Sequence, residues 1–230
     1  IFMAIIILLT GRIVRGQNDE TSHLKQKLLT VKADSSRVML LVDICNSFRN
    51  SNYDSAIAYG QQALDIAEKI QFPKGQIRAL TFLGRMETDV VNVPKALSYE
   101  LKAIQIAEQN NLTSQTALTH NNIGSIYLAL RDYPTALAYY RRAIKMCKTS
   151  PFQEGRDRAI GNMAYVFCQI NQLDSALYYA HQSKEDATTD PLDHRTLGQI
   201  HAKLRNDSIA LSYFHGGERL ALLSNNRRVL

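Results

Sequence analysis

The sequence has few cysteines, and their arrangement excludes a disulfide-stabilised scaffold. The three cysteines, Cys45, Cys147 and Cys168, are an odd number at unrelated spacings and include no CxxC pair. In an oxidising compartment a bond between Cys147 and Cys168 is conceivable. We favour the alternative that all three are small, buried apolar side chains.

The sequence also lacks the familiar motifs of catalysis and nucleotide binding. It contains no GxGxxG, GxxxxGK[ST], HExxH or GxSxG, and no EF-hand loop. His194 and His201 are seven residues apart and could share a helix face, but Asp193 is the one obvious further ligand nearby. A packing or capping role fits these histidines better than a metal site. We therefore expect a protein that is not an enzyme and that uses no cofactor and no metal.

A strongly basic patch is missing as well, although the formal net charge is +6. Setting Arg12 and Arg15 aside with the N-terminal segment leaves 25 basic against 21 acidic residues. The remaining cations are spread along helical segments, as at Arg141 and Arg142, without interleaved aromatic residues. Nucleic acid is therefore not expected as a partner, and neither is an anionic membrane surface.

The one long apolar run is short for a membrane span. Residues 1–9, IFMAIIILL, would rise only about 13 Å as a helix, against a hydrocarbon core of about 30 Å. The run has the length of a signal-peptide core, and the small residues Val14 and Gly16 place a possible cleavage site before Gln17. Because the chain starts at Ile1, a basic leader would lie upstream. The alternative is the tip of a truncated anchor or of a core helix.

Helical patterns alternate with breakers along the rest of the chain, and strand signals are few. Longer breakers recur about every forty residues, at 71–75, 109–111, 149–155 and 188–191. Within each interval a shorter break divides two helical stretches. These shorter breaks read RNSNYD, VNVP, LRDYP, NQLD and LRNDS. The periodicity predicts five helix pairs.

Two series of small residues keep a constant register through these pairs. One series opens the core face of each second helix, with separations of 40, 40, 40 and 34: Ala56, Ala96, Ala136, Ala176 and Ala210. The other stands twelve residues earlier, in each first helix: Ile44, Gly84, Gly124, Ala164 and Gly198. A helix pair of this length cannot bury its apolar stripe alone, so successive pairs must stack, and small residues belong where helix axes approach closely.

The pattern resembles the tetratricopeptide repeat family, in which Leu-Gly-x-x-Tyr of a first helix precedes Ala-x-x-x-Phe of a second. The third pair matches it best, with Ile123, Gly124 and Tyr127 followed by Ala136 and Tyr140. The second pair departs from it, because Glu87 and Glu100 replace both aromatic residues, and Asp43 and Ile44 make the first pair the weakest match. Forty-residue repeats are similar to those of kinesin light chains and bacterial peptide-sensing regulators.

The resemblance implies an all-α fold, a right-handed α-solenoid of about five antiparallel helix pairs. The expected organisation is a signal peptide or truncated anchor at 1–16, a leading cap helix at 17–36, a repeat array at 37–223 and a tail at 224–230 that suggests truncation or a continuing chain. Within the array the repeats are expected at 37–72, 77–111, 117–149, 157–188 and 191–223.

In the resembled family the first helices line a concave groove for an extended peptide or a helix. Carrying those positions over residue by residue gives a candidate groove lined by Arg78, Thr81, Phe82, Arg85, Asn121, Asn122, Ser125, Arg158, Asn162, Tyr165, Arg195 and Gln199. Asparagine amides can pair with a peptide backbone whatever its sequence, and arginines suit carboxylates. The alternative is that these are solvated polar residues or asparagines bonded to a neighbouring turn.

The resemblance therefore implies a non-enzymatic module that binds a protein or peptide. Chains with a signal-like start and repeats of this kind resemble the extracytoplasmic part of bacterial sensor kinases, in which a membrane span and an output domain follow. A periplasmic or extracytoplasmic location is expected on that basis. The alternatives are a free-standing cytoplasmic scaffold or peptide-responsive regulator, and the regulatory arm of an enzyme whose catalytic domain lies outside this chain.

Overall fold

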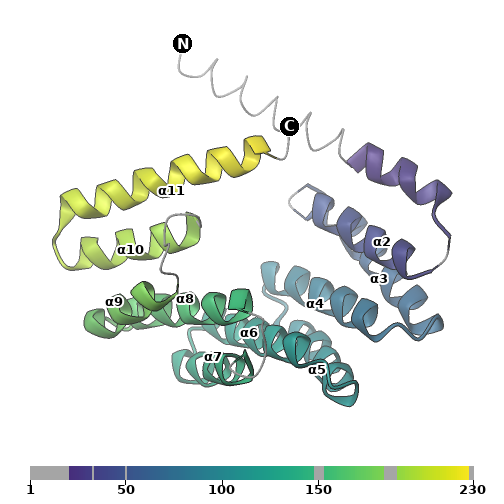
Figure 1. The fold of residues 1–230 in the computed structure, drawn as a ribbon, viewed down its shortest axis with the longest axis horizontal. Coiled ribbons are helices and arrows are strands. Elements are labelled where there is room, and N and C mark those ends of the chain that lie inside the picture. Colours follow the sequence, from purple (N-terminus) through teal and green to yellow (C-terminus); the bar gives the residue numbers. More distant parts are fainter. Residues whose placement is uncertain (1–20, 33, 50, 148–152, 184–190, 228–230) are drawn as a thin grey trace, which may run out of the picture. The chain divides into compact units, whose positions relative to one another are not determined.

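The computed structural model describes residues 21–227 apart from 33, 50, 148–152 and 184–190. All regular elements in these residues are helices (Figure 1). Residues 21–30 are helical and precede ten further helices. These are α2 (Ser35–Phe48), α3 (Tyr53–Lys69), α4 (Pro73–Asp89), α5 (Val93–Gln109), α6 (Thr113–Ala129), α7 (Tyr133–Cys147), α8 (Gln153–Gln169), α9 (Leu173–Gln182), α10 (Pro191–Lys203) and α11 (Asp207–Arg227).

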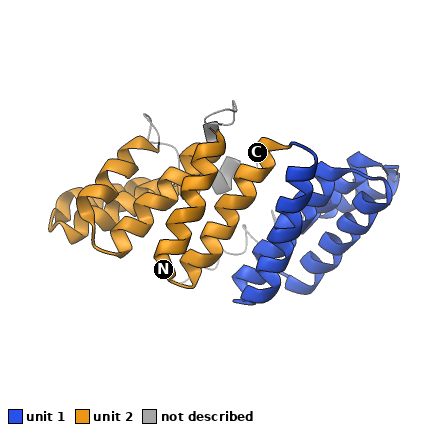
Figure 2. Cartoon of the chain, turned by 90° about the horizontal axis from the view of Figure 1, so that it is seen from below, with its two compact units in different colours: residues 1–111 blue, residues 112–230 orange. Residues whose placement is uncertain are grey.

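The helices form five consecutive pairs, from α2 with α3 to α10 with α11, and the chain divides into two compact units (Figure 2). One unit is residues 1–111 and the other is residues 112–230. Within each unit the second helix of a pair contacts the first helix of the next, as α3 contacts α4 and α7 contacts α8. The first helices also contact one another, as α2 contacts α4 and α6 contacts α8. The predicted all-α fold of stacked helix pairs is confirmed.

Small residues lie at the closest helix contacts, as the register predicts. A Cβ atom added to Gly124 would lie 2.7 Å from Cε1 of Tyr140, and one added to Gly198 would lie 2.5 Å from Cε1 of Phe214. The ring of each second helix therefore lies directly against the glycine backbone of its first helix. All five register alanines are buried as well. Such contacts leave no room for a side chain at the glycine positions.

The second pair replaces the aromatic contact by buried carboxylates. Glu87 and Glu100 are each 1% exposed, and a Cβ on Gly84 would lie 3.1 Å from Oε1 of Glu100. The Glu87 carboxylate accepts a hydrogen bond from Nδ2 of Asn92 at 2.9 Å and is 2.6 Å from Nζ of Lys95. The hydrogen bond to Glu87 raises the pKa of Lys95. A buried charge is tolerated here because it is paired and hydrogen-bonded.

The turns between helices use left-handed residues other than glycine. Positive φ angles occur at Gln71, Val91, Asn111, Arg131, Asn171 and Arg205. At the end of α4 the N–H of Asn92 bonds to the carbonyl of Glu87 at 2.8 Å, the pattern of a Schellman motif. Val91 occupies the left-handed position there with φ 60° and an exposed side chain. A β-branched residue is strained in that conformation.

Two of the second helices, α3 and α7, begin at a polar side chain that accepts a hydrogen bond from the backbone of the first turn. Asn52 Oδ1 accepts a hydrogen bond from the N–H of Ser55 at 2.9 Å, and Asp132 Oδ1 accepts one from Thr135 at 3.2 Å. Asp54 lies in the first turn of α3. A carboxylate there still favours the helix through its dipole.

The helix at residues 21–30 packs against the first pair. The Arg37 side chain donates hydrogen bonds to the carbonyls of Leu28 and Val31, at 3.0 and 3.1 Å. Nζ of Lys25 lies 4.7 Å from the centre of the Phe48 ring. The predicted signal or anchor at 1–16 and the tail end at 228–230 lie outside the described residues. None of the described helices is both long and apolar enough to cross a bilayer.

The three cysteines are free and buried, which agrees with the favoured interpretation of small apolar side chains. Burial raises the pKa of Cys45 to about 12 and also raises the pKa values of Cys147 and Cys168. The thiolate is therefore disfavoured at all three positions, and none of these cysteines is activated for nucleophilic chemistry.

Enlarging a register alanine should overpack the junction between pairs. Ala136 is fully buried, so Ala136→Leu is expected to lower the free energy of unfolding by about 1–3 kcal/mol. Ala138→Leu, an exposed position on the same helix, is the matched control. Thermal and urea unfolding followed by circular dichroism measure both variants. Equal stability of the two would contradict the register.

Relieving the strained turn should stabilise the first unit. Val91→Gly removes the Cβ clash of the left-handed conformation and is expected to raise the free energy of unfolding by about 1 kcal/mol. Asn171→Gly is the control, because asparagine at the equivalent turn already tolerates φ 61°. Calorimetry should show a higher melting temperature for the first variant and little change for the second; a lower one for Val91→Gly would rule out the strain.

Candidate functional site

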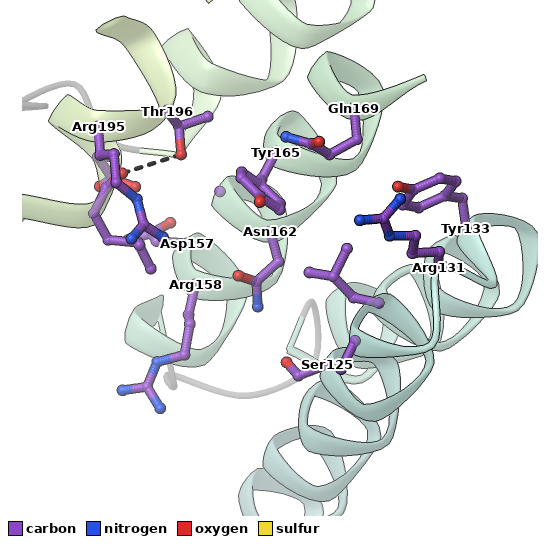
Figure 3. Close-up of a pocket in the computed structure, with 15 residues that line it drawn as sticks. Ser125, Arg131, Tyr133, Asp157, Arg158, Asn162, Tyr165, Gln169, Arg195 and Thr196 are labelled. Atoms are coloured by element: carbon purple, nitrogen blue, oxygen red, sulfur yellow. Dashed lines mark hydrogen bonds between the residues drawn. The ribbon is translucent and has the colours of Figure 1, made fainter. Parts of the chain in front are cut away.

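A polar cavity of about 700 Å³ lies in the unit formed by residues 112–230 (Figure 3). Three first helices, α6, α8 and α10, supply most of its walls, and the α6–α7 turn and the start of α7 complete it. Its lining comprises Ser125, Leu128, Ala129, Arg131, Tyr133, Asp157, Arg158, Gly161, Asn162, Tyr165, Gln169, Leu192, Asp193, Arg195 and Thr196. A volume of this size falls within the range of ligand-binding pockets.

The helical repeat explains which side chains reach the cavity. Positions three and four apart share a helix face, so Arg158, Asn162 and Tyr165 of α8 form one row. Asn162 and Tyr165 lie between Ser125 on one side and Arg195 on the other (Figure 3). Direct packing of α8 against both α6 and α10 brings the three helices together.

Cations outnumber anions in the cavity lining. Arg131, Arg158 and Arg195 face two carboxylates, those of Asp157 and Asp193. Oδ1 of Asp157 is 4.0 Å from Nη1 of Arg156, outside the lining. Arg131 and Arg195 form no ion pair with any described residue. The cavity therefore combines a positive excess with uncharged hydrogen-bonding groups, a composition suited to anionic or amide-bearing ligands.

A hydrogen bond between repeats fixes the amide of Asn162. Its Nδ2 donates to Oδ1 of Asn121 at 3.0 Å, and the carbonyl of Asn121 accepts from Oγ of Ser125 at 3.1 Å. The Ser125 hydroxyl also lies 3.3 Å from the hydroxyl of Tyr140. Burial raises the pKa of Tyr140 to about 12, with the bond to Ser125 acting in the opposite direction. These contacts hold the cavity wall and the buried core in one network.

The structure brings together part of the predicted groove. Five of the predicted side chains line the cavity: Ser125, Arg158, Asn162, Tyr165 and Arg195. Asn122 and Gln199 are half-buried on the same helices but are not part of the lining. Asn121 and Phe82 are only 4% and 2% exposed, so the expectation that they face an open groove is wrong. Asn121 instead supports Asn162, and the Phe82 ring belongs to the apolar core of its unit.

The predicted arginines of the other unit contact the preceding repeat. Nη2 of Arg78 is 3.3 Å from Oδ1 of Asp43, and Nη2 of Arg85 donates to Oδ1 of Asn46 at 2.7 Å. Thr81 bonds back to the carbonyl of Arg78 at 3.2 Å. A ligand carboxylate would have to compete with these partners. The predicted arginines of α4 thus connect two repeats, whereas Arg158 and Arg195 line the cavity.

Sequence reasoning missed several cavity residues, among them Arg131, Tyr133, Gln169 and Thr196. Arg131 and Tyr133 belong to the LRDYP break, from which the sequence predicts only a boundary between two helices. The left-handed backbone of Arg131, φ 59°, sets the direction of its side chain, and the helical period carries no information about turn residues. The recurrence of these breaks every forty residues is the one signal that could have drawn attention to them.

The two histidines considered as metal ligands pack on an aromatic ring. Tyr213 stacks on His201 with centroids 5.5 Å apart and meets His194 edge-on at 5.9 Å. Among the described residues no group of three or more potential ligands could hold a metal ion. The ring contacts support a packing role for both side chains.

In a comparison with protein families, the model of the tetratricopeptide repeat matches residues 115–187. No curated protein matches the chain by sequence. Solved structures match it over most of its length at low identity. A Rap protein complexed with competence and sporulation factor has a TM-score of 0.70 and 16% identity, covering 99% of this chain and 74% of that protein.

Two other solved structures show the same fold. The Rap conjugation gene regulator of plasmid pLS20, in complex with the Phr* peptide, has a TM-score of 0.70 and 16% identity over 82% of this chain, which spans 53% of that protein. PilF of Pseudomonas aeruginosa has a TM-score of 0.59 and 17% identity, covering 80% of this chain and 76% of that protein. The resemblance predicted from the sequence is confirmed: residues 115–187 match the tetratricopeptide repeat model, and the chain shares its helical fold with these proteins.

Proposed function

We propose that this chain is a non-enzymatic repeat module that binds a peptide or protein segment in the cavity between α6, α8 and α10. The observation that carries the proposal is the convergence of Arg158, Asn162, Tyr165 and Arg195, from two helices, on one polar cavity. Stacked repeats supply the rigid walls on which such a cavity depends.

The chemistry of the lining favours a peptide with at least one carboxylate. Arginine forms two parallel hydrogen bonds to a carboxylate, and the cavity has three arginines against two acids. Asn162 can donate to and accept from a peptide backbone, and Tyr165 offers a ring face and a hydroxyl. Gln169 and the Tyr133 ring add further amide and aromatic groups to the lining near the α6–α7 turn.

The similar structures support the peptide-binding part of this proposal. Two of them are Rap proteins described in complex with competence and sporulation factor and with the Phr* peptide. Another is named aspartyl phosphate phosphatase F of Bacillus subtilis, and it shares 16% identity with this chain. Identity at that level reflects the fold and carries no activity, so we base the non-enzymatic assignment on the missing catalytic motifs.

We further propose that the module is the extracytoplasmic sensing region of a bacterial signalling protein. The support is the signal-like run at residues 1–9 followed by forty-residue repeats. In this arrangement a ligand outside the cytoplasm would bind the repeats, and a membrane span with an output domain would transmit the signal. The alternative is a free-standing cytoplasmic scaffold or peptide-responsive regulator.

The cavity arginines should govern affinity for acidic peptides. Peptides selected from a random heptapeptide library with free carboxyl termini are expected to bind wild type. Arg158→Ala and Arg195→Ala should each weaken binding by about tenfold or more, since a charged hydrogen bond contributes about 1.5–3 kcal/mol. Isothermal titration calorimetry measures the affinity. Melting should be unchanged because both side chains are exposed.

Arg78→Ala is the matched control for this experiment, because Arg78 is an exposed arginine at the corresponding place of another repeat. The arginines are better sites for substitution than Asn162, because removing the Asn162 side chain would also leave the amide of Asn121 without its partner. Equal loss of affinity in all three variants, or peptides that bind without regard to Arg158 and Arg195, would sink the assignment of the site.

Location can be tested separately from binding. A reporter enzyme that is active only outside the cytoplasm, fused after residue 30 and expressed from the native start, should be active. Deleting residues 1–16 should abolish that activity, because it removes the apolar run. Activity is measured in intact cells and after fractionation. Retention of the complete fusion in the cytoplasm would contradict export and leave the cytoplasmic alternative.

A further inference from the structure

The outer face of α11 exposes apolar side chains that equivalent positions of the third pair bury. Leu137 and Tyr140 are 7% and 0% exposed, and they belong to α7, the second helix of a pair that packs against the next helix, α8. Leu211 and Phe214 stand in the same places relative to the register alanine of α11, and they are 57% and 38% exposed. Leu222 on the same helix is 55% exposed. This face is an apolar surface without a covering helix among the described residues.

A further repeat helix packed as α8 packs on α7 would meet a charged side chain at the rim of this face. The third pair has Ile144 at its rim, partly buried against the core. Glu218 holds the equivalent place in α11, with a side chain 72% exposed. An apolar helix laid over it would remove the carboxylate from water and leave it only His215 of the same helix, 3.9 Å away. The face therefore suits an occupant that brings apolar groups and a hydrogen-bond donor or cation beside Glu218.

The row of side chains along this face is complementary to the same row of a second copy when the two helices run antiparallel. Leu211, His215, Glu218 and Leu222 follow one another at spacings of four, three and four residues, the pattern of a coiled-coil seam. When a second copy of α11 runs antiparallel, Leu211 lies opposite Leu222 of the second copy. His215 then lies opposite Glu218 of the second copy, and each contact occurs twice about a two-fold axis.

The geometry of α11 is compatible with this arrangement. His215 and Glu218 are 76% and 72% exposed, and Nδ1 of His215 is 3.9 Å from Oε2 of Glu218 within the chain. Gly216 and Gly217, between them, face α10, where His194 lies against both. The seam thus points away from the α10–α11 contact, and the cavity residues of α10 take no part in it.

We propose that two copies of this chain associate along α11 in an antiparallel, two-fold symmetric contact centred between His215 and Glu218. The leucines at each end supply the apolar part, and the two His–Glu pairs set the register. A seam of one helix per copy is a small interface, so the expected association is reversible and in the micromolar range. The proposal is independent of what the cavity binds.

Sedimentation equilibrium of the complete chain between about 1 and 500 µM tests the association. Wild type should form a dimer, and Leu211→Ser with Leu222→Ser should raise its dissociation constant by at least about tenfold. Leu101→Ser is the matched control, since Leu101 is 53% exposed on α5. Circular dichroism verifies that each variant is folded. A monomer at all concentrations would overturn the proposal, and so would equal weakening by Leu101→Ser.

Exchanging charges distinguishes the proposed antiparallel register from nonspecific association of exposed apolar side chains. His215→Glu alone places like charges opposite one another across the axis and should weaken the dimer by about tenfold. Adding Glu218→Lys to that variant restores opposite charges and should recover the wild-type dissociation constant. A double variant no tighter than His215→Glu alone would refute the antiparallel pairing, whereas recovery supports it.

Discussion

The close contact between a large ring and a glycine backbone is the constraint on which the rest of the structure depends. Tyr140 can lie against α6 only because Gly124 has no side chain, and the same holds for Phe214 and Gly198. That contact brings the two helices of a pair together and fixes their mutual orientation. Because one pair cannot bury its remaining apolar face, the next pair must cover it. The alternation of small and large residues thus specifies stacking as well as pairing.

Stacking in turn places the polar side chains of successive first helices on one surface. Asn121 and Asn162 are forty-one residues apart in sequence, yet their amides share a hydrogen bond of 3.0 Å. In the other unit Arg78 reaches Asp43 and Arg85 reaches Asn46 across the corresponding repeat contact. The same positions therefore serve two purposes. Some connect repeats, and others line the cavity.

The departures from the repeat pattern mark where this chain differs from a generic array. Glu87 occupies the place that Tyr127 takes in the third pair, and Lys95 and Asn92 compensate for its buried charge. Val91 accepts a strained left-handed turn that glycine or asparagine would adopt more readily. Glu218 of α11 occupies the place that the apolar residue Ile144 takes in α7, and its charge changes what can pack on α11. Each departure is a local exchange within an otherwise constant register.

The sequence by itself determined the helix pairs, their register and the residues at the closest contacts. These features follow from the helical period and the forty-residue repeat, and both can be seen in the local order of apolar and small residues. It also placed Arg158, Asn162 and Arg195 on the inner face of their helices. Only the tertiary structure decided which of the predicted groove residues are accessible to a ligand. Asn121 is buried because α8 supplies its partner, Phe82 is buried because its ring packs into the core, and Arg131 reaches the cavity because its turn is left-handed. Those outcomes depend on neighbours distant in sequence and on turn geometry, which a one-dimensional period does not encode.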